Sequence, residues 1–149
     1  MAIGLAALGL LAFLLGCSGT FAQPQNSEPA AECSLTGTWR NNLTNTIHIE
    51  SVSDTGVFSG IFYTSLRYSI HIFPAALQGI QHQGLQPTFG FTISGISDGP
   101  TGVFVGQCLV DKNGKQQLRT TWLFRVKVGS AEEDWGATRV GTDIFWRIK

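Results

Sequence analysis

From Ser34 onward, apolar and polar residues alternate in short runs, a pattern typical of half-buried β-strands. Asparagine, aspartate, glycine and proline separate these runs and favour turns. The expected strands cover residues 34–41, 46–52, 57–64, 68–73, 88–95, 102–110, 117–128 and 139–148. The expected turns lie at residues 42–45, 54–56, 98–100 and 111–114, with a longer loop over 74–87.

The order of these strands predicts the fold class. Eight short strands follow one another with no helical pattern between them, which favours an all-β, up-and-down antiparallel barrel. A two-sheet sandwich is the alternative. Within 117–128, alternation places Leu118, Thr120, Trp122 and Phe124 on one face, which we expect to line the interior. An eight-stranded barrel is either filled by its own side chains or wide enough for one small ligand.

The first 22 residues differ from the rest of the chain. Residues 1–16 are uncharged, rich in alanine and leucine, and too short to span a bilayer comfortably. Thr20-Phe21-Ala22 fits the small-x-small rule for signal peptidase, so 1–22 is predicted to be a signal peptide of a secreted protein. A lipoprotein signal ending at Cys17 and a buried core helix are the alternatives. The polar segment 23–32 is expected to be disordered, and 33–149 to form the barrel domain.

Two cysteines, Cys33 and Cys108, remain once the leader is removed. An exported protein with two cysteines most simply contains one disulfide. Because 75 positions separate them, closing that loop would stabilise the fold by about 4 kcal/mol on the chain-entropy estimate. We therefore expect a structural bridge. A zinc site is disfavoured because no histidine accompanies the pair.

Charge and motif spacing argue against several function classes. Ten basic residues balance ten acidic ones, so neither nucleic acid nor an anionic membrane is an expected partner. The segment Gly95-Ile-Ser-Asp-Gly99 matches the G-x-S-x-G elbow of hydrolases, but another strand rather than a helix is expected after it. His48, His71 and His82 lack metal-ligand spacing. We expect no catalytic residues, no metal and no cofactor, and hence no enzyme.

Asn42-Leu43-Thr44 is an N-glycosylation sequon in an expected turn, where a glycan could be accommodated. In the last expected strand, Trp146 alternates with Asp143 and Phe145 and should face outward. Together with Ile144 it would form an apolar patch, which suggests a subunit contact. An isolated surface aromatic residue is the alternative reading of Trp146.

Four segments together resemble the avidin family across residues 33–148. The resemblance implies an avidin-like, calycin-type barrel of eight strands, a homotetramer, an extracellular location and one biotin per barrel. Gly37-Thr38-Trp39 alone is a weak calycin signature, whereas the full set is far more specific. The segments are Cys33-Ser-Leu-Thr-Gly-Thr-Trp39, Gln86-Pro-Thr-Phe-Gly-Phe-Thr92, Gly106-Gln-Cys108 and Trp135-Gly-Ala-Thr-Arg-Val-Gly141.

The resemblance also implies a biotin site. Asn41 matches a donor to the ureido oxygen, and Asn45 stands where the family has a serine that contacts the same oxygen. Thr64 and Asp143 match acceptors of the two ureido N–H groups. The family's aromatic walls correspond to Trp122 and Phe104, and a loop tryptophan that reaches a neighbouring subunit corresponds to Trp135. The expected biotin-binding set is Asn41, Asn45, Phe62, Thr64, Phe104, Trp122, Phe124, Trp135 and Asp143.

Several positions depart from the family pattern. Phe62 replaces a tyrosine hydroxyl on the ureido oxygen, and Gly102 replaces a threonine that meets the thioether sulfur. Gly95 and Ser97 lie in a segment where the family has a tryptophan and a phenylalanine. A lost hydrogen bond or apolar wall costs about 1–3 kcal/mol each. We therefore expect weakened biotin affinity. The alternatives are a barrel remodelled for another, more apolar ligand, and a filled structural barrel whose polar interior residues bond to one another.

Overall fold

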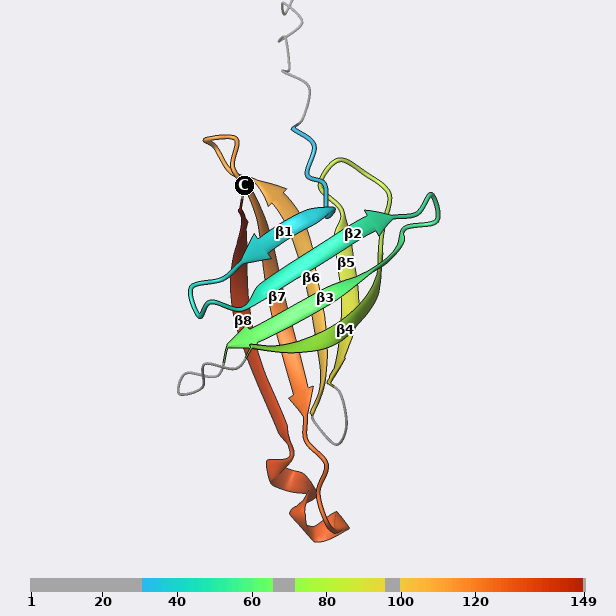
Figure 1. Ribbon diagram of the computed structural model, residues 1–149, viewed down its shortest axis with the longest axis vertical. Coiled ribbons are helices and arrows are strands. Elements are labelled where there is room, and N and C mark those ends of the chain that lie inside the picture. Colours follow the sequence, from blue (N-terminus) through green and yellow to red (C-terminus); the bar gives the residue numbers. More distant parts are fainter. Residues whose placement is uncertain (1–30, 66–71, 96–99, 149) are drawn as a thin grey trace, which may run out of the picture.

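The computed structural model describes residues 31–65, 72–95 and 100–148, and their secondary structure is almost entirely β (Figure 1). Alternation of apolar and polar residues in each run gives every strand one buried and one more exposed face. The leader and most of 23–32, with His71 and Ser97, lie outside the described residues. The strands are β1 (Gly37–Arg40), β2 (Thr46–Val52), β3 (Val57–Ser65), β4 (Ile72–Gln81), β5 (Thr88–Gly95), β6 (Thr101–Val110), β7 (Gln116–Arg125) and β8 (Thr138–Arg147).

Among the described residues these strands close into one barrel, in which each strand pairs antiparallel with its sequence neighbours. The closure is short, because β1 meets β8 only at Trp39 opposite Arg147 and at Arg40 opposite Trp146. The prediction of an eight-stranded up-and-down barrel is confirmed, and the sandwich alternative is wrong.

The fourth strand corrects the sequence prediction, which placed a strand at 68–73 and a loop over 74–87. The structure extends β4 through Gln81, and residues 68–71 lie outside the described part. Pro74 is tolerated because pairing with β5 begins one residue later, at Ala75. Gly79 is required because a Cβ there would lie 2.5 Å from Cζ of Phe58. Pro74 and Gly79 favoured a loop in the sequence prediction, but both lie within β4.

One end of the barrel is sealed around Trp39. This side chain is fully buried, and its indole N–H donates to the carbonyl of Leu35 at 2.8 Å. The guanidinium of Arg147 lies 4.3 Å from the centre of the Trp39 ring and also donates to the Thr36 carbonyl at 2.7 Å. Arg147 therefore ties the last strand to the chain entering the first, and burial lowers the pKa of its guanidinium.

The predicted interior face of the seventh strand is found as expected. Leu118 and Thr120 are buried, whereas Arg119 and Thr121, which alternate with them, are exposed. The strand ends at Arg125, three residues earlier than predicted. A short 3₁₀ helix, η1 (Ala131–Gly136), follows and projects beyond the end of the barrel opposite the C-terminus (Figure 1).

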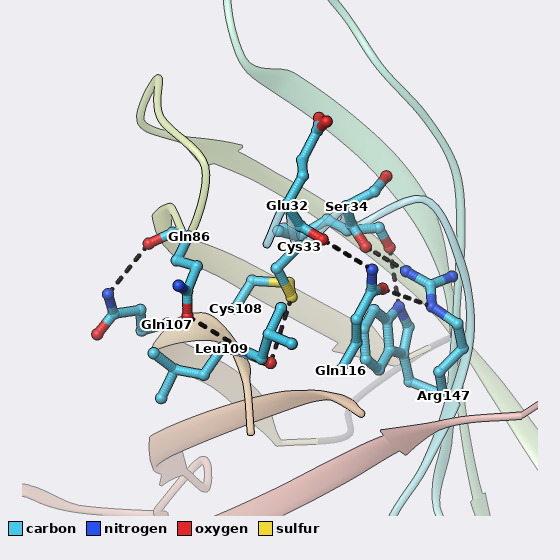
Figure 2. The surroundings of a disulfide bond; sticks show 12 residues. Glu32, Cys33, Ser34, Gln86, Gln107, Cys108, Leu109, Gln116 and Arg147 are labelled. Carbon is cyan, nitrogen blue, oxygen red and sulfur yellow. Dashed lines mark hydrogen bonds between the residues drawn. A yellow bond between two sulfur atoms is a disulfide. The ribbon is translucent and has the colours of Figure 1, made fainter. Parts of the chain in front are cut away.

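The predicted disulfide between Cys33 and Cys108 is confirmed (Figure 2). It fastens the segment before β1 to β6. The Cys33 backbone N–H also donates to the Leu85 carbonyl at 2.7 Å, and the Gln116 side chain donates to the Glu32 carbonyl at 3.0 Å. In the part of the chain that the structure describes, no helix has the length and apolar character needed to span a bilayer.

Candidate functional site

Two strands and the turn between β1 and β2 bring polar side chains together. Asn41 follows β1, Thr64 lies on β3 and Asp143 on β8, while Asn45 precedes β2. Aromatic side chains surround this group: Phe62, Phe104, Trp122 and Phe124 all lie on inward-facing positions of their strands. The site thus combines a few polar groups with an apolar wall, as small-molecule pockets do.

Asn41 shapes the turn between β1 and β2 and is held in place by it. Its Oδ1 accepts hydrogen bonds from the backbone N–H groups of Leu43, at 3.0 Å, and Asn45, at 2.9 Å. This local capping is typical of asparagine in turns. The orientation leaves Nδ2 buried, with no hydrogen-bond partner among the described residues.

Thr64 and Asn45 form a second polar pair. The Thr64 hydroxyl donates to Oδ1 of Asn45 at 3.1 Å. Because a hydroxyl has one proton and two lone pairs, this bond leaves the Thr64 oxygen able to accept. The side-chain amide nitrogen of Asn45, next to this bond, can donate. The pair therefore presents one acceptor and one donor.

Asp143 lies beside the N–H groups of Asn41 and Trp122. Burial raises the pKa of the Asp143 carboxyl, and these two N–H groups partly oppose the rise because they favour the charged form. Neither nitrogen meets the geometry of a hydrogen bond, so the Trp122 indole N–H, like Asn41 Nδ2, is buried without a partner in the described chain. Unpaired buried donors are costly in the interior of a protein.

The raised pKa of Asp143 predicts a pH-dependent stability difference. Because the folded-state pKa exceeds the unfolded one, burial of the charged form lowers stability above the folded pKa, and this effect disappears as the carboxyl takes up a proton. Asp143→Asn should therefore be more stable than the wild type at neutral pH, with the gain shrinking in acid. Thermal unfolding between about pH 3 and pH 8 measures this. A difference independent of pH would contradict it.

The aromatic wall is organised by Phe104, which is buried and stacks on Phe91 at 4.7 Å between ring centres. Phe62 approaches it at 5.6 Å and Phe124 edge-on at 5.8 Å. Trp122 meets Phe124 at 5.2 Å. Aromatic pairs at these separations add to the stability gained from burial.

Two glycines make room for this wall, and the sequence did not reveal what they do. A Cβ at Gly102 would lie 2.5 Å from Cε1 of Phe124 and 2.8 Å from Cγ1 of Ile93. A Cβ at Gly141 would lie 2.3 Å from the Trp122 ring. The Phe124 ring therefore occupies the space that a side chain at position 102 would need. Gly102 pairs with Phe124 on the neighbouring strand, and Gly141 pairs with Trp122. The sequence alone does not give this strand register, so it could not predict these contacts.

Adding a methyl group at Gly102 should destabilise the barrel. We expect Gly102→Ala to lower the free energy of unfolding by about 1–3 kcal/mol, because the Phe124 ring must move. Phe124→Leu should relieve most of this loss, giving a non-additive double-mutant cycle in urea denaturation. Gly90→Ala is the matched control, since its Cβ would stay 3.5 Å from the nearest atom. Additive effects of the two substitutions would contradict the packing.

Trp135 is the one predicted site residue that the structure does not bring to this group. It lies on η1 with 91% of its surface exposed, and no residue of this described helix is buried. Asp134 forms an ion pair with Arg125, which also donates to the Thr138 hydroxyl at 3.1 Å. The base of η1 is thus tied to β7 and β8, and Trp135 points away from its own barrel.

Other candidate chemistry does not converge. His48 and His82 lie at the surface, each beside a threonine hydroxyl. Within 31–65, 72–95 and 100–148, no group of three or more His, Cys, Asp or Glu side chains could hold a metal ion.

Comparison with known proteins agrees with the fold and with the sequence resemblance. A family model described as the avidin family matches residues 29–148. Avidin-related protein 1 of Gallus gallus is 47% identical over 120 residues, covering 79% of this chain and 80% of that protein. Avidin of the same species is 43% identical over 124 residues, covering 80% and 82%. A crystal structure of a biotin-binding protein from chicken superposes with a TM-score of 0.73 at 42% identity, covering 79% and 98%. The chain belongs to the avidin family.

Proposed function

We propose that this protein is a secreted binding protein that holds biotin non-covalently inside its barrel. Membership of the avidin family supports a binding protein rather than an enzyme, with biotin as ligand and no cofactor. The proposed binding set is the one that the family resemblance implies, and the polar cluster around Asp143 is its centre.

The observation that carries the proposal is the buried Nδ2 of Asn41, which lies beside the Asp143 carboxyl and has no hydrogen-bond partner in the described chain. A filled structural barrel would pair such groups internally. The ureido ring of biotin offers one carbonyl acceptor and two N–H donors. In our proposal Asn41 Nδ2 and the Asn45 amide donate to the carbonyl oxygen. Thr64 and Asp143 accept from the two ureido N–H groups.

Three positions support a reduced affinity. Phe62 has no hydroxyl to donate to the ureido oxygen, and Gly102 has no side chain to meet the bicyclic ring. Gly95, at the end of β5, supplies no aromatic wall. Each loss is worth about 1–3 kcal/mol, and such losses need not add. The expected affinity is therefore weaker by orders of magnitude than that of a site with all these groups.

Restoring the hydroxyl at position 62 should tighten binding. We expect Phe62→Tyr to gain about 1 kcal/mol in biotin affinity, or about fivefold, because the ureido oxygen receives another donor. Without ligand the same buried hydroxyl should slightly lower stability, since position 62 is buried. Calorimetric titration and thermal unfolding of both proteins measure these opposite effects. An unchanged or weaker affinity would show that position 62 does not face the ureido oxygen.

Thermal unfolding with and without biotin tests the proposal. A ligand that binds only the native state raises the unfolding temperature with its concentration. We expect such a rise with biotin and none with valeric acid, which has the side chain of biotin but lacks the ureido head. No rise with biotin would contradict the proposal.

A second candidate ligand class is favoured by the aromatic lining. Phe62, Phe104, Trp122 and Phe124 form a continuous apolar wall, and the Phe124 ring fills the space beside Gly102. A barrel remodelled in this way would prefer a small, more apolar molecule. Stabilisation by lipid-like or aromatic competitors, but not by biotin, would favour this alternative.

Assembly into a homotetramer is part of the proposal. In the proposed tetramer the exposed indole of Trp135 enters a neighbouring subunit. The outer face of β6 to β8 exposes Val105, Leu123 and Val140 beside a groove of about 560 Å³. Exposed apolar groups of this kind are typical of interfaces. A tetramer is expected by light scattering at micromolar concentration. A monomer would rule out a site shared through Trp135.

Secretion is the last part of the proposal. The leader predicted for 1–22 implies that the mature chain starts near Gln23 and that Asn42, exposed in its turn, meets the glycosylation machinery. Amino-terminal sequencing of protein collected from the medium of producing cells tests this. A lipid-modified Cys17 at the new terminus would instead support the lipoprotein alternative.

A further inference from the structure

The seam between β1 and β8 leaves a depression on the outer surface of the barrel. β1 ends at Arg40, which stands opposite Trp146, so β8 has no paired partner from β1 beyond that point. Asn42 follows two residues later, exposed in the turn after β1. Asn42 and the outer surface of β8 enclose a hollow of about 270 Å³, lined by Asn42, Thr142, Asp143, Ile144 and Trp146.

The lining of this hollow is suited to a sugar ring. Trp146 is 37% exposed and, with Ile144, provides an apolar floor on which the C–H face of a pyranose can stack. Thr142 also lines the hollow, and its hydroxyl can bond to the hydroxyl or acetamido groups of the sugar. A pyranose ring has an apolar face and a polar edge, which match the apolar floor of the hollow and the Thr142 hydroxyl.

Asn42, which lines the hollow, indicates which molecule would fill it. Asn42 is the acceptor of the sequon Asn42-Leu43-Thr44, and it is exposed. A glycan attached there begins at the edge of the hollow, so its first sugar needs no long linker to reach Trp146. The groove proposed as a subunit contact shares Thr142, Asp143 and Ile144 with this hollow, but Asn42 and Trp146 line only the hollow.

We propose that the hollow holds the first N-acetylglucosamine of a glycan on Asn42, with Trp146 as its stacking platform. The glycan then covers the exposed part of the Trp146 ring. This inference rests on the proposed passage through the secretory pathway and not on biotin binding.

The test uses the full chain secreted from cultured animal cells. The mass of the intact protein shows whether Asn42 carries a glycan, with Thr44→Ala removing the sequon and Thr44→Ser keeping it. Acrylamide quenching of tryptophan fluorescence then reports the access to Trp146, in a Trp135→Phe background because Trp135 is the most exposed indole. Loss of the sequon should raise the quenching constant by about twofold. Trimming the glycan to its first sugar should leave the protection intact.

Trp146→Thr is the matched control, since it should abolish the difference between glycosylated and unglycosylated protein. A secreted chain with no sugar on Asn42 would overturn the inference, as would a glycosylated chain whose Trp146 is quenched equally. Protection of Trp146 that depends on protein concentration instead of the glycan would overturn it in favour of a second copy. Biotin titration of Thr44→Ala and Thr44→Ser proteins that retain Trp135 keeps the two proposals separate, because the glycan result and the biotin result can each fail while the other holds.

Discussion

Replacing Asp143 by alanine should weaken biotin binding by about 3 kcal/mol, or about a hundredfold. The substitution removes the acceptor for one ureido N–H. It also removes the carboxyl group beside the buried N–H groups of Asn41 and Trp122. Truncating one partner of a buried polar cluster costs more than the bond itself, because the remaining groups are left unsatisfied. Calorimetric titration of the variant measures the change.

Asp143→Asn is the matched control for this experiment. It keeps the size of the side chain and one acceptor oxygen, so its affinity should fall less than that of the alanine variant. Thermal unfolding without ligand separates a lost contact from a damaged fold, since both variants should remain folded. An alanine variant that binds biotin within about threefold of wild type would show that Asp143 does not contact the ligand.

Removing the disulfide should have the largest effect on stability. We expect the Cys33→Ser/Cys108→Ser variant to lose about 4 kcal/mol in the free energy of unfolding, because the bridge closes a loop between residues 75 positions apart. The segment before β1 would then be attached by hydrogen bonds such as that of the Gln116 side chain to the Glu32 carbonyl (Figure 2). Urea denaturation of wild type and variant measures the loss.

Reduced wild type provides the control for the disulfide. Wild type unfolded in the presence of a strong reductant should match the double variant, which isolates the bridge from any effect of the two serines. Biotin binding by the folded variant should persist, since the disulfide lies near the Trp39 end and away from Asp143. A stability loss below about 1 kcal/mol would contradict a structural bridge of this loop length.

The fold was predictable because alternation and turns are local signals. Leu118, Thr120 and Trp122 face inward as their spacing predicts. The fourth strand was misplaced because the fit of Pro74 and Gly79 depends on their neighbours: Pro74 lies before the pairing with β5, and Gly79 lies under the Phe58 ring. No property of the segment alone carries that information.

The candidate site was predictable in its residue types and less so in its packing. The family resemblance identified Asn41, Thr64 and Asp143 as site residues. It did not predict that the Asn41 side chain caps its own turn, which leaves Nδ2 buried without a partner in the described chain. The contact between Gly102 and the Phe124 ring crosses two strands and requires their register. Sequence reading counted Gly102 as a lost contact, whereas the structure shows that an aromatic ring occupies its space.

Isothermal titration of the purified mature protein with biotin tests the central claim most directly. The proposed ureido site predicts saturable binding at one biotin per chain, and the missing hydroxyl at Phe62 predicts an affinity that calorimetry can measure without displacement. No heat of binding, together with no change in thermal unfolding, would mean that the chain has kept the avidin fold but does not bind biotin.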